Sequence, residues 1–258
     1  MCTVSVVPHG TGVRVVCNRD ERRTRPAALP PALNHLGGTR AFFPIDPEGG
    51  GTWIGVNDAG LVVTLLNAHP TNAAGSRQQA VGRSDTRNRD RREGVERSRG
   101  LIVRELLGCA SFAQAIAAAA ETDARTFAPF RLVILQSRSV AVVTSDGGVS
   151  LIRTQAHLNE PLLFTSSSLG DAVVELPRRR LFERIVLSRR AGWLSGQSRF
   201  HRHRWPSRPE ISVRMERPDA MTVSRTAIEL ADDGVRLLYE APPCGRDRQD
   251  VLECCFSR

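Results

Sequence analysis

The second residue of the chain, Cys2, offers the most distinctive chemistry in the sequence. Removal of Met1 is common when the next side chain is small, and it would leave a thiol and an α-amine on one residue. Because an α-amine titrates at about 7.7–8.0, it is partly neutral near pH 7 and can take the thiol proton directly or through one water. A cysteine activated by its own amine is a known nucleophile. The alternative is that Met1 is retained and Cys2 is only an end residue.

A dense polar cluster, residues 18–21, follows the strand predicted at 13–17. Side chains alternate along a strand, so Asn18 and Asp20 should face one side and Arg19 and Glu21 the other. Asp20 could orient the α-amine, and Arg19 could bind a substrate carboxylate or phosphate bidentately. The alternative is a solvated charged turn.

Two further polar sites follow apolar strands. Asn67 ends a nearly all-apolar hairpin, and its side-chain amide could donate to an oxyanion or simply end the strand. Ser166 and Ser167 could line a pocket or cap the helix that follows Asp171.

The histidines and remaining cysteines predict no metal site. His201 and His203 lie two apart in an arginine-rich segment that we expect to be an exposed polar loop. The Cys254–Cys255 pair has no histidine partner, whereas zinc sites need four ligands with regular spacing. We expect reduced thiols, with Cys17 and Cys109 buried as small apolar residues.

The order of elements predicts an α+β fold. Apolar runs and turn residues predict strands at 3–7, 13–17, 52–56, 61–66, 131–136, 140–144, 149–153, 162–165, 211–215 and 235–239, and helices at 101–107, 111–120 and 173–190. Prolines 26, 30 and 31 indicate an irregular stretch, and residues 75–100 a mobile loop or insertion. Hairpins flank central helices, which does not match an alternating βαβ order and favours two stacked, mostly antiparallel sheets with helices outside.

Composition, charge and hydropathy argue against several classes of function and location. The formal charge of +9 comes from 36 arginines and no lysine, scattered rather than clustered around stacking aromatics, so we expect no nucleic-acid partner. No apolar window is long enough for a transmembrane helix, and no signal peptide is recognisable, so we expect no stable membrane insertion and a cytoplasmic location.

An ordered set of short motifs resembles the NRDE family, also called the Transport and Golgi organisation protein 2 family. The matching segments are residues 1–3, 18–21, 53–57, 60–61, 67, 98–101, 165–167, 169–171, 217–220 and 222–224. They occur in family order from Cys2 to about Pro243. The resemblance implies a single domain over 1–243, with an arginine-rich insertion at about 75–99 and a loosely ordered tail at 244–258.

The resemblance also implies a fold and a site. The family is similar to N-terminal-nucleophile hydrolases, with a four-layer αββα sandwich, and to their cysteine branch, which cleaves non-peptide amides in penicillin V acylase and bile salt hydrolase. On that pattern Cys2 attacks, Asp20 supports it and Asn67 helps to form the oxyanion hole. Asn18 stands where the acylases carry an arginine, and Ser166 or Ser167 stands where they carry an asparagine.

Two functions follow as hypotheses. The first is hydrolysis of a small-molecule amide through Cys2, with Asn18, Arg19, Ser166 and Ser167 as substrate-binding residues and no cofactor. The second is a non-catalytic carrier or chaperone that binds haem or an acylated metabolite in the same cleft. A structural trafficking factor is a weaker third alternative.

Overall fold

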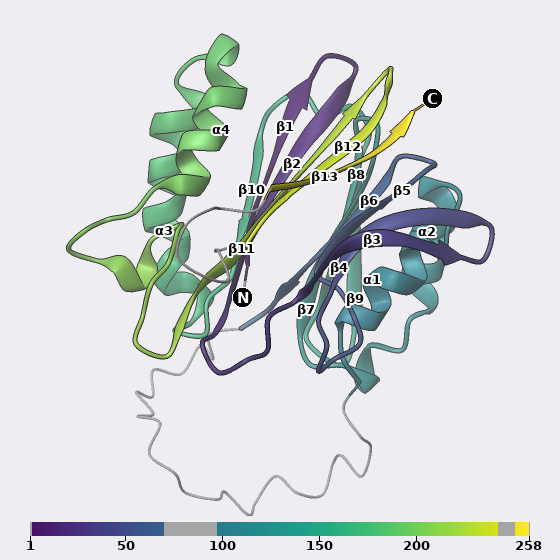
Figure 1. The fold of residues 1–258 in the computed structure, drawn as a ribbon, viewed down its shortest axis with the longest axis horizontal. Coiled ribbons are helices and arrows are strands. Elements are labelled where there is room, and N and C mark those ends of the chain that lie inside the picture. The colour runs from purple at the N-terminus through teal and green to yellow at the C-terminus, as the bar shows by residue number, and fades with distance from the viewer. Residues whose placement is uncertain (1, 70–96, 242–250, 258) are drawn as a thin grey trace, which may run out of the picture.

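A computed structural model describes residues 2–69, 97–241 and 251–257 (Figure 1). Two β-sheets face each other, and a pair of helices covers the outer face of each sheet, which gives the four layers expected. The predicted α+β sandwich is therefore confirmed. Most of the predicted insertion, and Cys244, lie outside the described residues.

The first sheet holds the chain's beginning. Its six strands are β1 (Cys2–His9), β2 (Gly12–Arg22), β10 (Leu162–Thr165), β11 (Ala220–Ala231), β12 (Gly234–Glu240) and β13 (Val251–Ser257). They lie in the order β10-β1-β2-β11-β12-β13, with every neighbouring pair antiparallel. Because β2 runs on to Arg22, the polar cluster 18–21 lies within a central strand and not after it.

The second sheet lies opposite. Its strands are β3 (Leu29–Leu36), β4 (Thr39–Ile45), β5 (Ile54–Asn57), β6 (Leu61–Asn67), β7 (Phe130–Gln136), β8 (Ser139–Ser145) and β9 (Ser150–Gln155), paired antiparallel in chain order. The irregular stretch predicted around Pro30 and Pro31 is wrong in part, since both lie in β3. β3 is an edge strand, where a missing N–H can face away from the sheet.

Helices form the two outer layers. α1 (Gly100–Leu107) and α2 (Phe112–Glu121) cover the second sheet, and α3 (Asp171–Phe182) and α4 (Trp193–Arg202) cover the first (Figure 1). Ser111 caps α2 by accepting from the N–H of Gln114, as its capping-box pattern predicts. α3 continues as a π-helical turn (Glu183–Leu187), and short 3₁₀ turns occupy Ala124–Thr126, Arg190–Gly192 and Pro209–Ile211.

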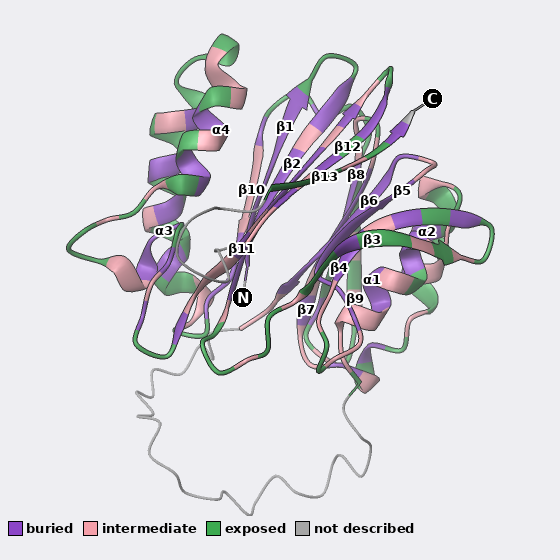
Figure 2. Cartoon of the chain, viewed as in Figure 1, coloured by how far each residue is buried: buried purple, intermediate pink, exposed green. Residues whose placement is uncertain are grey.

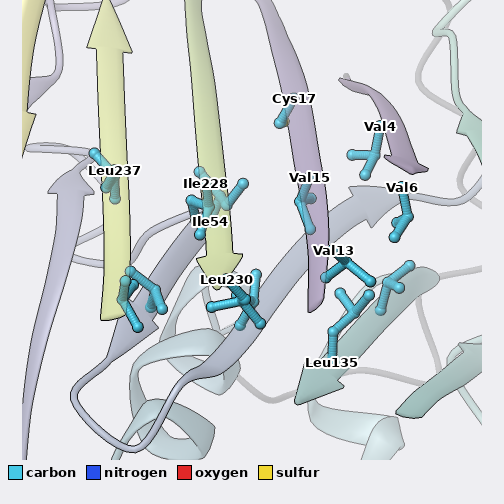
Figure 3. Packing of buried hydrophobic residues seen from close by; sticks show 14 of the residues in the cluster. Val4, Val6, Val13, Val15, Cys17, Ile54, Leu135, Ile228, Leu230 and Leu237 are labelled. Carbon is cyan, nitrogen blue, oxygen red and sulfur yellow. The ribbon is translucent and has the colours of Figure 1, made fainter. Parts of the chain in front are cut away.

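Three apolar layers hold the sandwich together. The largest lies between the sheets, where Val4, Val15 and Cys17 meet Ile54 and Leu135 (Figure 3). Smaller clusters join each sheet to its helices. Buried residues therefore follow both sheets and the inward sides of the helices (Figure 2). The predicted burial of Cys17 is confirmed, whereas Cys109 is only partly buried. Each fully buried aliphatic side chain contributes roughly 1.5–3 kcal/mol.

Three other sequence predictions are wrong. Residues 211–215 are no strand but a connection whose Ile211, Val213 and Met215 are buried. Residues 251–257, predicted as loose tail, pair with β12. The exposed loop expected around His201 is instead the end of α4, and His201 is buried.

Candidate active site

A cavity of about 900 Å³ opens between the sheets, where β1 begins and β2 and β6 end. Cys2, Asn67 and Trp53 line it together with charged side chains. The arginines of its lining are Arg19, Arg22, Arg25, Arg97, Arg99 and Arg217. The acidic residues are Glu21, Asp46, Glu48 and Asp219. The cavity therefore brings a thiol, an amide and many fixed charges into one space.

Cys2 is the first residue of β1 and is held on both sides. It pairs with Arg19 of β2 across the ladder. On the other side, the Cys2 N–H donates to Ser166 Oγ at 3.2 Å, and the Ser166 N–H donates to the Cys2 carbonyl at 3.0 Å. Its side chain is only 4% exposed yet borders the cavity. The thiol thus has a fixed position at the cavity wall.

A second thiol lies directly behind Cys2. Cys17 is two residues before Arg19 on β2, so it shares the inter-sheet face with Cys2. A hydrogen bond from the Cys17 thiol lowers the pKa of Cys2, although burial opposes it. The same bond, together with burial in the apolar core, raises the pKa of Cys17 well above its ordinary value. Of the two thiols, Cys2 is therefore the one that ionises more easily.

Asp20 lies on the opposite face of β2 from Arg19. Burial raises its pKa, while the charge of Arg178 and a 2.6 Å hydrogen bond from Thr222 Oγ1 oppose that rise. Asp20 is not among the described residues that line the cavity, but its charge acts on the Cys2 thiol. Asp20 therefore acts on the start of β1 through its charge, from the face of β2 opposite to Arg19.

The Arg19 side chain extends from β2 toward the second sheet and forms part of the cavity wall. Its guanidinium lies 4.2 Å from the centre of the Trp53 ring, and it makes long ion pairs with Glu21 (3.4 Å) and Asp46 (3.5 Å). Asp46 binds Arg25 more closely, at 2.6 Å. Arg19 is thus a buried, oriented cation beside Cys2, with planar donors suited to a carboxylate or phosphate.

Asn18 faces away from the cavity and into the helix layer. Its Nδ2 donates to the carbonyls of His201 (2.8 Å) and Val213 (2.9 Å). Its Oδ1 must therefore accept from His201 Nδ1 at 3.0 Å, which leaves His201 Nε2 to accept from the Ser5 hydroxyl at 2.7 Å. Burial lowers the pKa of His201 well below its usual range. This Ser5–His201–Asn18 set is a buried structural network and does not bring Asn18 to the cavity.

The serines that follow β10 make contacts with two different parts of the molecule. Ser166 holds the backbone of Cys2. Ser167 belongs to the helix start instead, because its N–H donates to Asp171 Oδ1 at 2.9 Å and it is not among the described cavity-lining residues. Asp171 also accepts from the N–H of His69 at 3.2 Å, so the start of α3 is joined to the cavity rim.

Sequence reasoning missed Arg217 and Trp53 as site residues. Arg217 is 8% exposed, lines the cavity, donates to Ser168 Oγ at 3.1 Å and acts electrostatically on Asp20. Both lie within the matched family motifs, which was the signal available for them. Among the described residues, no three His, Cys, Asp or Glu side chains gather closely enough to hold a metal ion.

Solved structures similar to this chain define its class. Penicillin V acylase from Agrobacterium tumefaciens matches with a TM-score of 0.53 at 12% identity, over 98% of this chain and 85% of that one. A Caenorhabditis elegans orthologue of N-acylethanolamine-hydrolysing acid amidase matches with a TM-score of 0.58 at 16% identity, over 88% and 92%. The chain therefore has the N-terminal-nucleophile hydrolase fold.

The family is narrower than the fold. The sequence profile of the Transport and Golgi organisation 2 family matches residues 4–186, and the chain belongs to that family. The resemblance inferred from the motifs is thus confirmed. No curated protein sequence matches this chain.

Proposed function

We propose that the chain hydrolyses a non-peptide C–N amide bond through Cys2 after Met1 is removed. The observation that carries the proposal is the position of Cys2: an oriented thiol of lowered pKa at the wall of a cavity that Asn67 also lines. The thiolate, and not the thiol, is the nucleophile, so a lowered pKa favours attack near neutral pH.

In the proposed reaction the Cys2 sulfur attacks the amide carbonyl carbon. The Asn67 amide donates to the oxyanion that forms. The C–N bond then breaks, the leaving amine takes a proton from the Cys2 α-ammonium, and an acyl thioester remains. Water adds to the thioester with the α-amine as base and releases the acid and the thiol.

The charges of the cavity favour an anionic substrate. Arg19 and Arg217 are both buried, and both line the cavity that Cys2 borders. Guanidinium groups bind carboxylate or phosphate with paired hydrogen bonds. We therefore propose a substrate that carries such a group close to its amide.

The haem-carrier hypothesis has weaker support. A porphyrin needs broad apolar faces, whereas the described lining combines six arginines and four acidic residues with few apolar side chains. A haem titration followed by absorbance tests this alternative. We expect no saturable spectral shift at a one-to-one ratio.

Intact-mass spectrometry with an electrophilic acyl probe tests the hydrolase proposal. We expect the native protein to lack Met1 and to gain one acyl group that Cys2→Ala loses. Cys255→Ala is the matched control, because Cys255 is an exposed thiol far along the chain in β13. It should remove only background labelling.

Two results would defeat the proposal. One is a native protein that retains Met1. The other is labelling in the Cys2→Ala protein equal to that of the native protein, with Cys255→Ala abolishing it.

A further inference from the structure

A second, separate cavity lies on the outer helix layer. It encloses about 280 Å³, and Leu176, Arg180 and Arg184 of the α3 segment form one wall. Trp205 and Arg208, which follow α4, form the other. It shares no lining residue with the Cys2 cavity.

Three positive charges meet at this cavity. Within the described chain, the guanidinium groups of Arg180, Arg184 and Arg208 make neither an ion pair nor a hydrogen bond; the neighbouring Arg179, by contrast, pairs with Glu175 at 2.8 Å. The whole segment from Asp171 to Glu210 holds ten arginines and four acidic residues. Most of the chain's formal excess of positive charge therefore lies in this helix layer.

The far wall of the cavity is firmly built. The Trp205 N–H donates to Ser212 Oγ at 2.8 Å, and that hydroxyl donates to the Arg208 carbonyl at 3.1 Å. The Arg208 N–H closes the turn on the Trp205 carbonyl at 3.1 Å. These bonds hold the backbone that carries Trp205 and Arg208 in a closed turn against Ser212.

Aliphatic side chains are exposed beside the arginines. Val173 (45%), Leu176 (53%) and Leu187 (41%) lie along α3 and its π-helical continuation. The layer of α3 and α4 forms one outer side of the molecule (Figure 1). One exposed helical surface therefore combines apolar side chains, a tryptophan and unpaired arginines.

We propose that this surface binds peripherally to an anionic membrane surface, with lipid phosphate groups held by Arg180, Arg184 and Arg208. Guanidinium groups favour phosphate geometry, tryptophan favours the membrane–water interface, and exposed aliphatic side chains reach the acyl boundary. A nucleic acid would meet a single aromatic ring here and no row of stacking platforms. No helix of the described chain is long and apolar enough to cross a membrane, so the binding is to its surface.

Vesicle co-sedimentation of the full chain tests the proposal. We expect binding to vesicles of phosphatidylglycerol and phosphatidylcholine, little binding to phosphatidylcholine alone, and release by salt. Arg180→Gln/Arg184→Gln should bind about 30-fold more weakly, from the contribution of two basic side chains at an anionic surface. Leu176→Ser should also weaken binding, because it removes an apolar contact with the acyl boundary.

Arg40→Gln/Arg125→Gln is the matched control. It removes the same net charge from exposed positions in β4 and in the 3₁₀ turn after α2, which belong to the second sheet and its helix layer, so it should bind within about threefold of native. All these positions are exposed, and circular dichroism verifies that each variant is folded.

Four outcomes would overturn the proposal. The first is no binding of the native protein to anionic vesicles. The second is an equal loss in the two double variants, which would mean that net charge alone acts. The third is complete release by excess soluble glycerol phosphate, which would indicate a site for free phosphate. The fourth is equal binding to soluble polyglutamate that Leu176→Ser leaves unchanged, which would assign the surface to an acidic protein.

Discussion

The Arg178→Met substitution should strongly destabilise the fold, because Arg178 ties the α3 segment to the strands that hold Cys2. Arg178 is 1% exposed. Its guanidinium donates to Thr3 Oγ1 and Thr165 Oγ1, both at 2.7 Å, and to the carbonyls of Ile211 (3.0 Å) and Ser212 (2.8 Å). One side chain thus connects β1, β10, α3 and the connection before β11.

The magnitude follows from what the substitution leaves behind. The two threonine hydroxyls lie 3.4 Å apart and can bond to each other. The two carbonyls would stay buried without that donor, at roughly 1.5–3 kcal/mol for each lost bond to a charged group. Relief from burying the charge offsets part of this, so we expect a loss of about 3–5 kcal/mol, typical of breaking a buried charged network.

Urea unfolding at pH 7 measures the change in the free energy of unfolding. Arg179→Met is the matched control, since this neighbour is half exposed and, among the residues that the structure describes, its side chain pairs only with Glu175 one turn earlier. It should cost about 0.5 kcal/mol or less. A loss below about 1 kcal/mol in Arg178→Met, or one equal to the control, would refute the role assigned to Arg178.

Three other predictions concern pH, thiol chemistry and packing. The pKa of His201 is lowered in the folded state, so the unfolded chain binds the proton first as the pH falls below about 6.5. The free energy of unfolding, measured in urea, should therefore drop by about 1 kcal/mol between pH 7 and pH 5.5. His201→Gln should lack that drop, and equal slopes would contradict the prediction. Cys17→Ala should raise the pKa of Cys2, so the pH dependence of Cys2 alkylation, followed by peptide mass spectrometry, should move to higher pH. Cys17→Ser keeps a hydrogen-bond donor and should move it less. Identical pH–rate curves for the native protein and Cys17→Ala would refute the role of this hydrogen bond. Gly51→Ala should cost about 1–3 kcal/mol in urea unfolding, because its Cβ would lie 2.4 Å from opposing backbone, whereas Gly38→Ala meets nothing within 4 Å; equal costs would count against this packing.

The parts of the fold that were predicted correctly are local. The β1–β2, β5–β6 and β7–β8 hairpins are apolar runs joined by short turns, so their pattern and their pairing lie in the same stretch of sequence. β3 was missed because its prolines suit an edge strand only, and edge position is a property of the whole sheet. Residues 211–215 alternate between apolar and polar side chains, but this pattern does not by itself show pairing with another strand, and Ser212 is buried along with its apolar neighbours.

In the candidate site, too, the features predicted correctly are local in the sequence, and the features that were missed depend on distant contacts. Cys2 and Asn67 stand at strand ends, which local patterns locate, and both line the same cavity. Asn18 could not be placed from sequence, because its partner His201 lies 183 residues away in a helix that the sequence pattern did not reveal. Arg217 reaches the cavity because the start of β11 pairs with the end of β2, a contact that no spacing encodes.

The cations of the outer helix layer have a consequence for handling the protein. A lysine-based surface loses its charge in alkaline buffer, whereas guanidinium groups are charged in all ordinary buffers, and the chain contains no lysine. The surface formed by Arg180, Arg184 and Arg208 carries no amine that an alkaline buffer could neutralise. An alkaline wash will leave whatever anion is held there in place, and only competing ions will elute it.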